Sequence, residues 1–155
     1  MATYRAVTAW SLQPGEDFLK GRYGRAHEVT FEDGPTVPGT ASRHVVGKWA
    51  APGAVDPEQM LVAALSACHM LTFLHKAREA GFVVTAYRDR AEGVMAANAE
   101  GRMAVARVVL RPEITYQGGD PDAATRERLH HAAHEECFIA NSVTTEVVVE
   151  EPALA

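Results

Sequence analysis

The order of predicted elements indicates an α+β fold with antiparallel sheets. Short β-prone segments come first, followed by one long apolar helix, a β-hairpin, a second helix and a last strand. The 155 residues are enough for one domain with a buried core, and we expect a single domain spanning 1–155. Apolar residues make up 47% and charged residues 23% of the chain, which is the balance of a folded globular protein.

Three short strands are predicted in the first third of the chain. Residues 3–10 are rich in strand-forming side chains, and residues 26–33 partly alternate between apolar and polar positions. Residues 44–49 form a third short segment of this kind. Between the first two lies a glycine-containing loop, Gly21-Arg22-Tyr23-Gly24-Arg25.

The long helix has clear signals at both ends. Asp56 is a good N-cap, Pro57 suits the first helical position, and Gly81 offers a C-terminal stop, so we expect a helix from Asp56 to about Ala80. Its apolar run, Met60–Leu74, has 15 residues and is shorter than the ~20 needed to span a bilayer. Because the run is apolar nearly all round, it must be covered on several sides, which favours a homo-oligomer.

The second half of the chain predicts a hairpin, a helix and a strand. Residues 83–95 and 102–116 are β-prone and flank a short loop, which is a hairpin signal. Residues 122–136 are typical of a more polar helix, and residues 144–150 of a last strand. The tail, residues 151–155, is expected to fray.

Charge and cysteine content exclude several classes of protein. The 15 Lys and Arg against 20 Asp and Glu give a net charge of −5, without the basic stripe of a nucleic-acid binder. Two cysteines are too few for a disulfide framework. The chain does not open on a basic and then apolar segment, so we expect a cytoplasmic protein without a membrane partner.

The two cysteines are the first candidates for chemistry. Cys68 is predicted in the middle of the long helix and Cys137 just after the second helix. Isolated buried cysteines usually behave as small, inert apolar residues. Here His69 adjoins the first thiol and His134 precedes the second, and titratable neighbours favour reactive thiols.

A metal site is an alternative interpretation of the same region. His130, His134 and Cys137 follow one another at i, i+4 and i+7, on one face of a helix. With Cys68 or Glu58 as a fourth ligand they could bind zinc, although the spacing is no standard zinc motif. In the simpler interpretation His130 and the adjacent His131 lie on the surface, and only His134 packs near Cys137.

Two motifs resemble the signatures of the OsmC/Ohr family of thiol-dependent peroxidases. The first is Asp56-Pro57-Glu58-Gln59 followed by Leu65-Ser66-Ala67-Cys68-His69. The second is His134-Glu135-Glu136-Cys137-Phe138-Ile139-Ala140-Asn141-Ser142, between the second helix and the final strand. The order of elements also fits, so the likeness covers nearly the whole chain. It implies an intertwined homodimer, with six-stranded sheets around the central helices and active sites at the interface.

The resemblance implies a role for each matching residue. Cys68 would attack an organic hydroperoxide and become a sulfenic acid, and Cys137 would resolve it as a disulfide. Glu58 would hold an arginine near the reactive thiol; Arg25 is preferred and Arg22 is a rival. Glu58 and Cys68 lie ten residues apart, or about 15 Å along a helix axis, so Glu58 cannot serve Cys68 of its own subunit unless the helix kinks, and a site shared between two subunits resolves this.

The family resemblance also implies a substrate class and a reductant. Apolar walls, including Met60, Leu65 and Phe138, would favour organic hydroperoxides, and a dithiol or protein thiol would reset the pair without a cofactor or metal. Two positions depart from the better-known members: His69 replaces an aromatic residue after the first cysteine, and Phe138 replaces a proline after the second. A non-catalytic, ligand-binding stress protein on the same fold is a further alternative.

Overall fold

The structure is a computed structural model, and it describes residues 1–32 and 34–151. Asp33, at the end of the second predicted strand, and residues 152–155, for which fraying is predicted, lie outside these ranges. The chain forms two compact units, Met1–Met60 and Leu61–Ala155, whose boundary falls inside the long helix. Each unit is described by itself.

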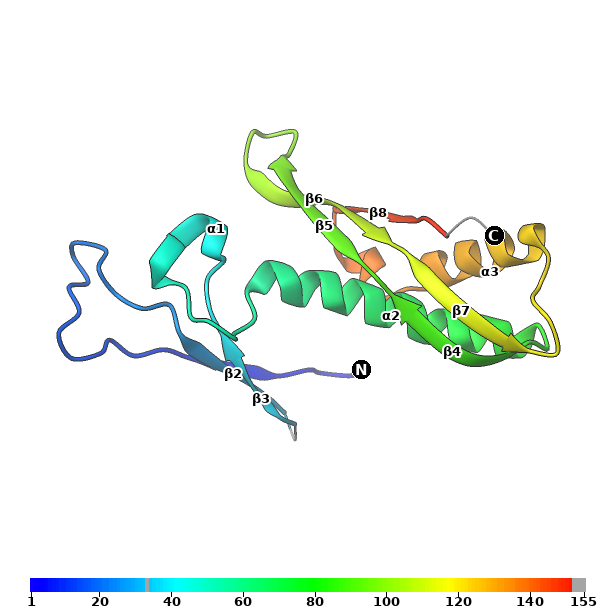
Figure 1. The fold of residues 1–155 in the computed structure, drawn as a ribbon, viewed down its shortest axis with the longest axis horizontal. Coiled ribbons are helices and arrows are strands. Elements are labelled where there is room, and N and C mark those ends of the chain that lie inside the picture. Colours follow the sequence, from blue (N-terminus) through cyan, green and yellow to red (C-terminus); the bar gives the residue numbers. More distant parts are fainter. Residues whose placement is uncertain (33, 152–155) are drawn as a thin grey trace. The chain divides into compact units, whose positions relative to one another are not determined.

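The first unit holds a three-stranded antiparallel sheet in the order β1-β2-β3 (Figure 1). Its strands are β1 (Ala6–Ala9), β2 (His27–Phe31) and β3 (Thr36–Gly39). The first two confirm the predicted strands 3–10 and 26–33 with shorter bounds. The third was not predicted, because a four-residue Thr-Val-Pro-Gly segment carries little β signal.

The predicted third strand at residues 44–49 is wrong. That segment is a short helix α1 (Arg43–Val46) followed by a 3₁₀ turn η1 (Gly47–Trp49). The hydroxyl of Ser42 accepts a hydrogen bond from the His44 amide at 3.3 Å and so starts a helical turn. This local cap outweighs the β preference of the two valines in the segment.

The long helix α2 (Pro57–Glu79) has the predicted bounds. Its start is a reciprocal cap, in which the Gln59 amide donates to Asp56 Oδ1 at 2.8 Å and the Asp56 amide donates to Gln59 Oε1 at 3.2 Å. Gly81, two residues past the end, has φ of 84°, a backbone conformation that favours glycine. Sequence signals at both ends therefore fix this helix.

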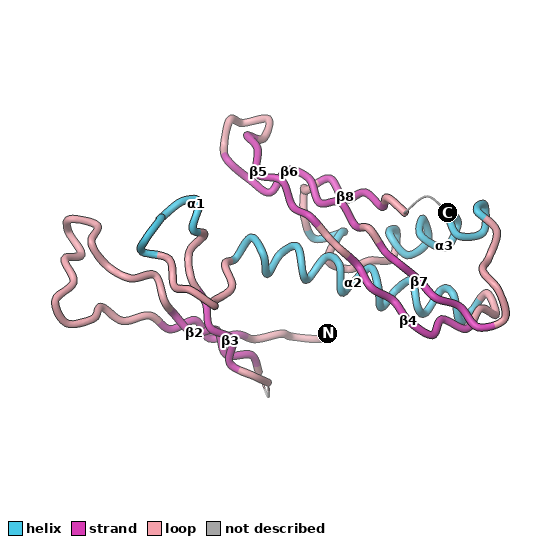
Figure 2. Tube along the Cα trace, in the orientation of Figure 1, coloured by secondary structure: helices cyan, strands magenta, loops and turns pink. Residues whose placement is uncertain are grey.

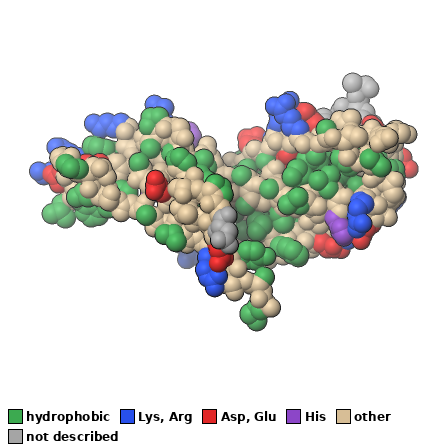
Figure 3. All heavy atoms as spheres, turned by 90° about the horizontal axis from the view of Figure 1, so that it is seen from below, with side chains coloured by type: hydrophobic (Ala, Val, Ile, Leu, Met, Phe, Trp, Pro, Cys, Tyr) green, Lys and Arg blue, Asp and Glu red, His purple; other side chains and the backbone are tan. Residues whose placement is uncertain are grey.

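Part of the apolar surface of α2 in the second unit is left exposed by the described residues of that unit. Its buried residues form one stripe along the helix, Leu65, His69, Phe73 and Ala77, whereas Leu71 on another side is 63% exposed. Figure 3 shows hydrophobic side chains exposed at many places on the face that it draws. The 23-residue helix α2 contains an 18-residue window with a mean hydropathy of 1.3, so it is long and apolar enough to cross a membrane by length and composition, a test that core helices also pass.

The second unit contains the predicted hairpin, with each arm divided into two strands (Figure 2). The strands β5 (Glu92–Ala97) and β6 (Met103–Leu110) pair next to the loop, while β4 (Val83–Asp89) and β7 (Pro112–Gln117) pair farther from it. Both pairings are antiparallel. The last strand, β8 (Glu146–Val149), adds to β6 in parallel, so the sheet that contains it is mixed.

The core of this unit lies between α2, the sheets and the second helix α3 (Ala123–Glu135). Asp122 caps α3 by accepting from the Thr125 amide at 2.7 Å, which confirms the predicted start. Leu65 packs against β6 residues in one cluster, and Phe73 packs against α3 residues in another. A 3₁₀ turn η2 (Ala140–Ser142) follows α3. The central helix thus carries Cys68 between two packed regions.

Gly93 on β5 marks a close approach of the hairpin to α2. A Cβ atom there would lie 2.5 Å from Val62 Cγ2, inside contact distance. We expect Gly93→Ala to lower the free energy of unfolding by about 1–3 kcal/mol, because valine in a helix is held to one rotamer and cannot turn away. Urea unfolding would measure the loss. Adding Val62→Ala should restore part of it, and an unchanged midpoint in Gly93→Ala would contradict the predicted clash.

Candidate functional site

The two cysteines lie together although they are 69 positions apart in sequence. Cys68 is half-buried on α2, and Cys137 is 1% exposed just after the C-cap of α3. The Ile139 amide donates to Cys68 Sγ and the Ala140 amide donates to Cys137 Sγ, each at 3.5 Å. The turn after α3 therefore directs two successive N–H groups to the two sulfur atoms.

These contacts give the two thiols different environments. Burial, together with a smaller contribution from the neighbouring Cys68 thiol, raises the pKa of Cys137 to about 11, while the amide of Ala140 opposes the shift. Cys68 is accessible, and its amide donor stabilises negative charge on the sulfur. This asymmetry would allow Cys68 to react first with a ligand and Cys137 to react afterwards with Cys68.

A series of hydrogen-bonded polar side chains begins at the residue next to Cys68. His69, only 1% exposed, lies with Nε2 3.0 Å from Nδ1 of His130 on α3. His130 Nε2 lies 3.0 Å from Glu151 Oε1, and the second oxygen of that carboxylate accepts from Arg126 Nε at 3.0 Å. These hydrogen bonds thus link α2, α3 and the segment after β8.

Burial favours the neutral form of both imidazoles. It lowers the pKa of His69 to about 4, helped by the nearby His130 and His134. Burial also lowers the pKa of His130, although the Glu151 carboxylate opposes this shift. With Glu151 as the acceptor, His130 donates from Nε2 and accepts from His69 at Nδ1. His69 Nδ1 then has no hydrogen-bond partner among the described residues.

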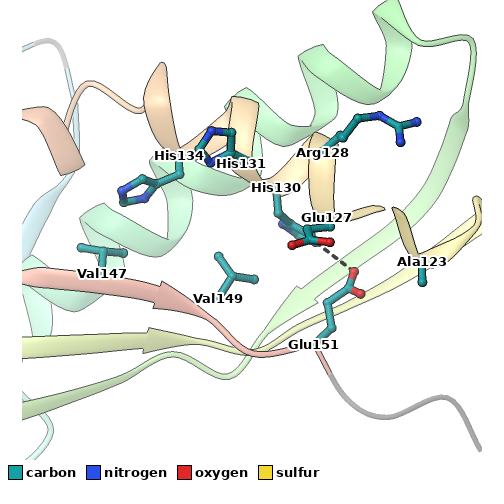
Figure 4. A pocket seen from close by; sticks show the side chains of 9 residues that line it. All are labelled: Ala123, Glu127, Arg128, His130, His131, His134, Val147, Val149 and Glu151. Carbon is teal, nitrogen blue, oxygen red and sulfur yellow. Dashed lines mark hydrogen bonds and ion pairs between the residues drawn. The ribbon is translucent and has the colours of Figure 1, made fainter. Parts of the chain in front are cut away.

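An open cavity of about 660 Å³ lies over α3 and β8, beside the contact between His130 and Glu151 (Figure 4). Figure 4 shows the His130–Glu151 contact at its side and the valines of β8 below the histidines of α3. The cavity is lined by both charged and apolar residues: Ala123, Glu127, Arg128, His130, His131, His134, Val147, Val149 and Glu151.

Within the first unit, the side chain of Arg25 packs against a neighbouring aromatic ring, whereas Arg22 is exposed. The Arg25 guanidinium lies over the Tyr23 ring, 3.4 Å from its centroid, and donates to the Tyr23 carbonyl. The Arg25 amide also donates to the Trp49 carbonyl at 3.0 Å. Arg22 is exposed. Glu58, on the first turn of α2, has a buried Oε2 without a hydrogen-bond partner among the described residues.

The three predicted substrate-wall residues have different environments. Met60 is half-buried on α2. Leu65 is fully buried in the core of the second unit, where it packs against Val108 and Leu110. Phe138 is 80% exposed, directly after Cys137. Of the three residues, Phe138 therefore has the most exposed side chain.

The histidines of α3 are not arranged as a metal site. Within residues 1–32 and 34–151, no three His, Cys, Asp or Glu side chains converge on a common point. Both ring nitrogens of His130 face other partners, His69 and Glu151. The simpler expectation that His130 lies on the surface is also wrong, since it is buried, whereas His131 is exposed as expected.

Sequence reasoning missed two sets of residues around Cys68. The hydroxyl of Ser66 donates to Asp89 Oδ2 at 2.5 Å, and the Arg111 amide donates to Asp89 Oδ1 at 2.6 Å. The other set is the chain from His69 to Arg126. The isolated polar residues Ser66 and His69 within the apolar run were the available signal, because buried polar groups need partners.

Comparison with known proteins identifies the family. Residues 50–151, more than half of the chain, match the family of OsmC-like proteins. The chain belongs to this family. An OsmC-like protein of unknown function from Vibrio cholerae is 42% identical, with a TM-score of 0.94 over 98% of this chain and 100% of that one. The α+β OsmC fold, with its long central helix, is therefore confirmed.

More distant OsmC relatives share the fold. An organic hydroperoxide resistance protein OsmC from Legionella pneumophila is 23% identical, with a TM-score of 0.68 over 97% of this chain and 96% of that one. The organic hydroperoxide resistance protein OhrB of Bacillus subtilis is 18% identical, with a TM-score of 0.68 over 97% and 98%. No curated protein matched the chain.

Proposed function

We propose that this OsmC-family protein is a thiol-dependent peroxidase that reduces organic hydroperoxides to alcohols in the cytoplasm. The observation that carries the proposal is the pairing of two free thiols, one accessible and one buried, with an amide donor directed to each sulfur. Family membership and the hydroperoxide-resistance proteins among its structural relatives support a redox role in stress.

The reaction follows from the asymmetry of the two thiols. The Cys68 thiolate attacks the outer oxygen of ROOH, the O–O bond breaks, and the alkoxide takes a proton to leave as ROH. Cys68 is then a sulfenic acid. The Cys137 sulfur displaces its hydroxyl group, which leaves as water with the Cys137 proton, and an S–S bond forms. A dithiol or protein thiol then reduces the disulfide by two exchange steps and is itself oxidised.

We assign Arg25 and Glu58 to the attack step. A guanidinium beside Cys68 would favour the thiolate and stabilise charge on the departing oxygen, and Glu58 would orient that guanidinium. The hold of Tyr23 on Arg25 supports Arg25 over the exposed Arg22.

A homodimer with active sites at its interface accounts for two further observations. Glu58 and Cys68 lie on one continuous helix, about 15 Å apart along its axis, so Glu58 would serve the cysteine of a second copy. The exposed apolar side chains of α2 would be covered by that copy.

Apolar residues near the site, with Phe138 the most open, would favour organic hydroperoxides over hydrogen peroxide.

The pKa of Cys137 predicts how the reactivity of its thiol depends on pH. With the pKa raised to about 11, only about one Cys137 in ten thousand is a thiolate at pH 7, and the fraction rises about tenfold per pH unit below that pKa. We expect alkylation of Cys137 in reduced protein, followed by peptide mass spectrometry, to accelerate in this proportion from pH 7 to 10. A plateau below pH 9 would contradict the assigned environment.

Peroxide consumption by the full chain tests the proposed function. With excess dithiothreitol, we expect cumene hydroperoxide to be consumed catalytically and faster than hydrogen peroxide. Protein alkylated with iodoacetamide is the control and should be inactive. Consumption no faster than with dithiothreitol alone would overturn the proposal.

A further inference from the structure

We propose that His130 is a positioning residue of the redox pair: acting through His69, it holds Cys68 against Cys137. The inference rests on the proposed redox function of the two cysteines. Neither histidine contacts a sulfur atom in the described hydrogen bonds, so the role is one of placement. The carrying observation is a buried imidazole pair that joins α2, which bears Cys68, to α3, which ends just before Cys137.

The geometry of the pair favours this role. His69 directly follows Cys68 on α2, and His130 lies on α3 seven residues before Cys137. Their rings lie nearly parallel, at 6° with centroids 5.3 Å apart, and Phe73 stacks on His130 at 4.4 Å. The His69–His130 hydrogen bond therefore ties α2 to α3 at the residue directly after Cys68.

Two further contacts anchor the ends of this arrangement. Glu151 binds His130 and Arg126, so the imidazole of His130 is held on its outer side. Ser66, two residues before Cys68, is tied to Asp89. The segment of α2 that carries Cys68 is thus fixed on both sides of the cysteine, as expected where a reactive group must keep a defined position.

A purely apolar contact between α2 and α3 would not explain why histidines occupy positions 69 and 130. Two imidazoles buried side by side need partners, and an unmet buried acceptor costs stability. These hydrogen bonds satisfy both ring nitrogens of His130 and Nε2 of His69, since His130 donates to the Glu151 carboxylate and accepts from His69. A residue at position 69 must therefore donate at the Nε2 position. This requirement gives a sharp pair of variants.

The equilibrium between the Cys68–Cys137 disulfide and glutathione tests the proposal without using peroxide. Disulfide formation requires closely constrained Cα and Cβ positions, so looser helices should lower its equilibrium constant. We expect His69→Asn, which is too short to reach His130, to lower the constant about tenfold, or ~30 mV in potential. His69→Gln, whose amide can donate near the Nε2 position, should stay within about threefold of the parent.

Controls make the result decisive. His131→Asn changes an exposed histidine of α3 and should leave the constant unchanged. Should His69→Asn fail to fold, Glu151→Ala loosens His130 from the edge of the fold and should lower the constant in the same direction. Equal constants in the folded variants and the parent would overturn the positioning role. Absence of peroxide turnover with shifted constants would overturn the peroxidase instead.

Discussion

Cys68→Ser is expected to abolish hydroperoxide turnover, with a loss of at least about 10³-fold, on the scale seen when a catalytic nucleophile is removed. A serine hydroxyl at this position has the same amide donor but is a poor nucleophile towards the O–O bond. Initial rates with cumene hydroperoxide and dithiothreitol measure the loss.

Cys137→Ser is the matched control for that variant, because it removes the second thiol and keeps the first. Cys68 should still react once and then accumulate as sulfenic and higher acids, so activity should decline within a few turnovers. If Cys137→Ser loses the first turnover while Cys68→Ser retains it, the two roles are reversed and the account fails.

Arg25→Gln should reduce the rate constant for Cys68 oxidation by about 10²- to 10³-fold, the range found when a donor to developing oxyanion charge is removed. The variant keeps hydrogen-bonding capacity but loses the charge that would favour the thiolate. Stopped-flow measurement of Cys68 oxidation under single-turnover conditions gives the constant directly.

Arg22→Gln is the matched control in the same loop, where an exposed arginine should be replaceable with less than about a twofold effect. A larger loss in Arg22→Gln than in Arg25→Gln would transfer the role to Arg22. Equal rates in both variants and the parent would remove arginine from the attack step.

Much of the fold could be predicted because its signals are local. Asp56, Pro57 and Gly81 fix the ends of α2, and Asp122 fixes the start of α3, each through contacts within a few residues. The predicted strand at residues 44–49 is wrong, although its signal is also local. The valines of this segment favour a strand, but the residue that caps the helix, Ser42, lies before the segment begins.

The site was predictable only in part, because much of it is formed by distant segments. The cysteines and their motifs are visible in the sequence. The chain from His69 through His130 to Glu151 joins three segments, and only the fold brings them together. The simpler interpretation of the sequence places both His130 and His131 on the surface, although the helical period places only one of the two on the buried face.

Cysteine accounting by intact mass tests the central claim, that Cys68 and Cys137 form a redox-active pair. Reduced protein would receive one equivalent of cumene hydroperoxide and then an alkylating reagent. We expect rapid loss of two hydrogen atoms and protection of both thiols from alkylation, with Cys137→Ser gaining oxygen instead. If both thiols remain alkylatable after prolonged excess peroxide, the pair is not redox-active and the peroxidase account is wrong.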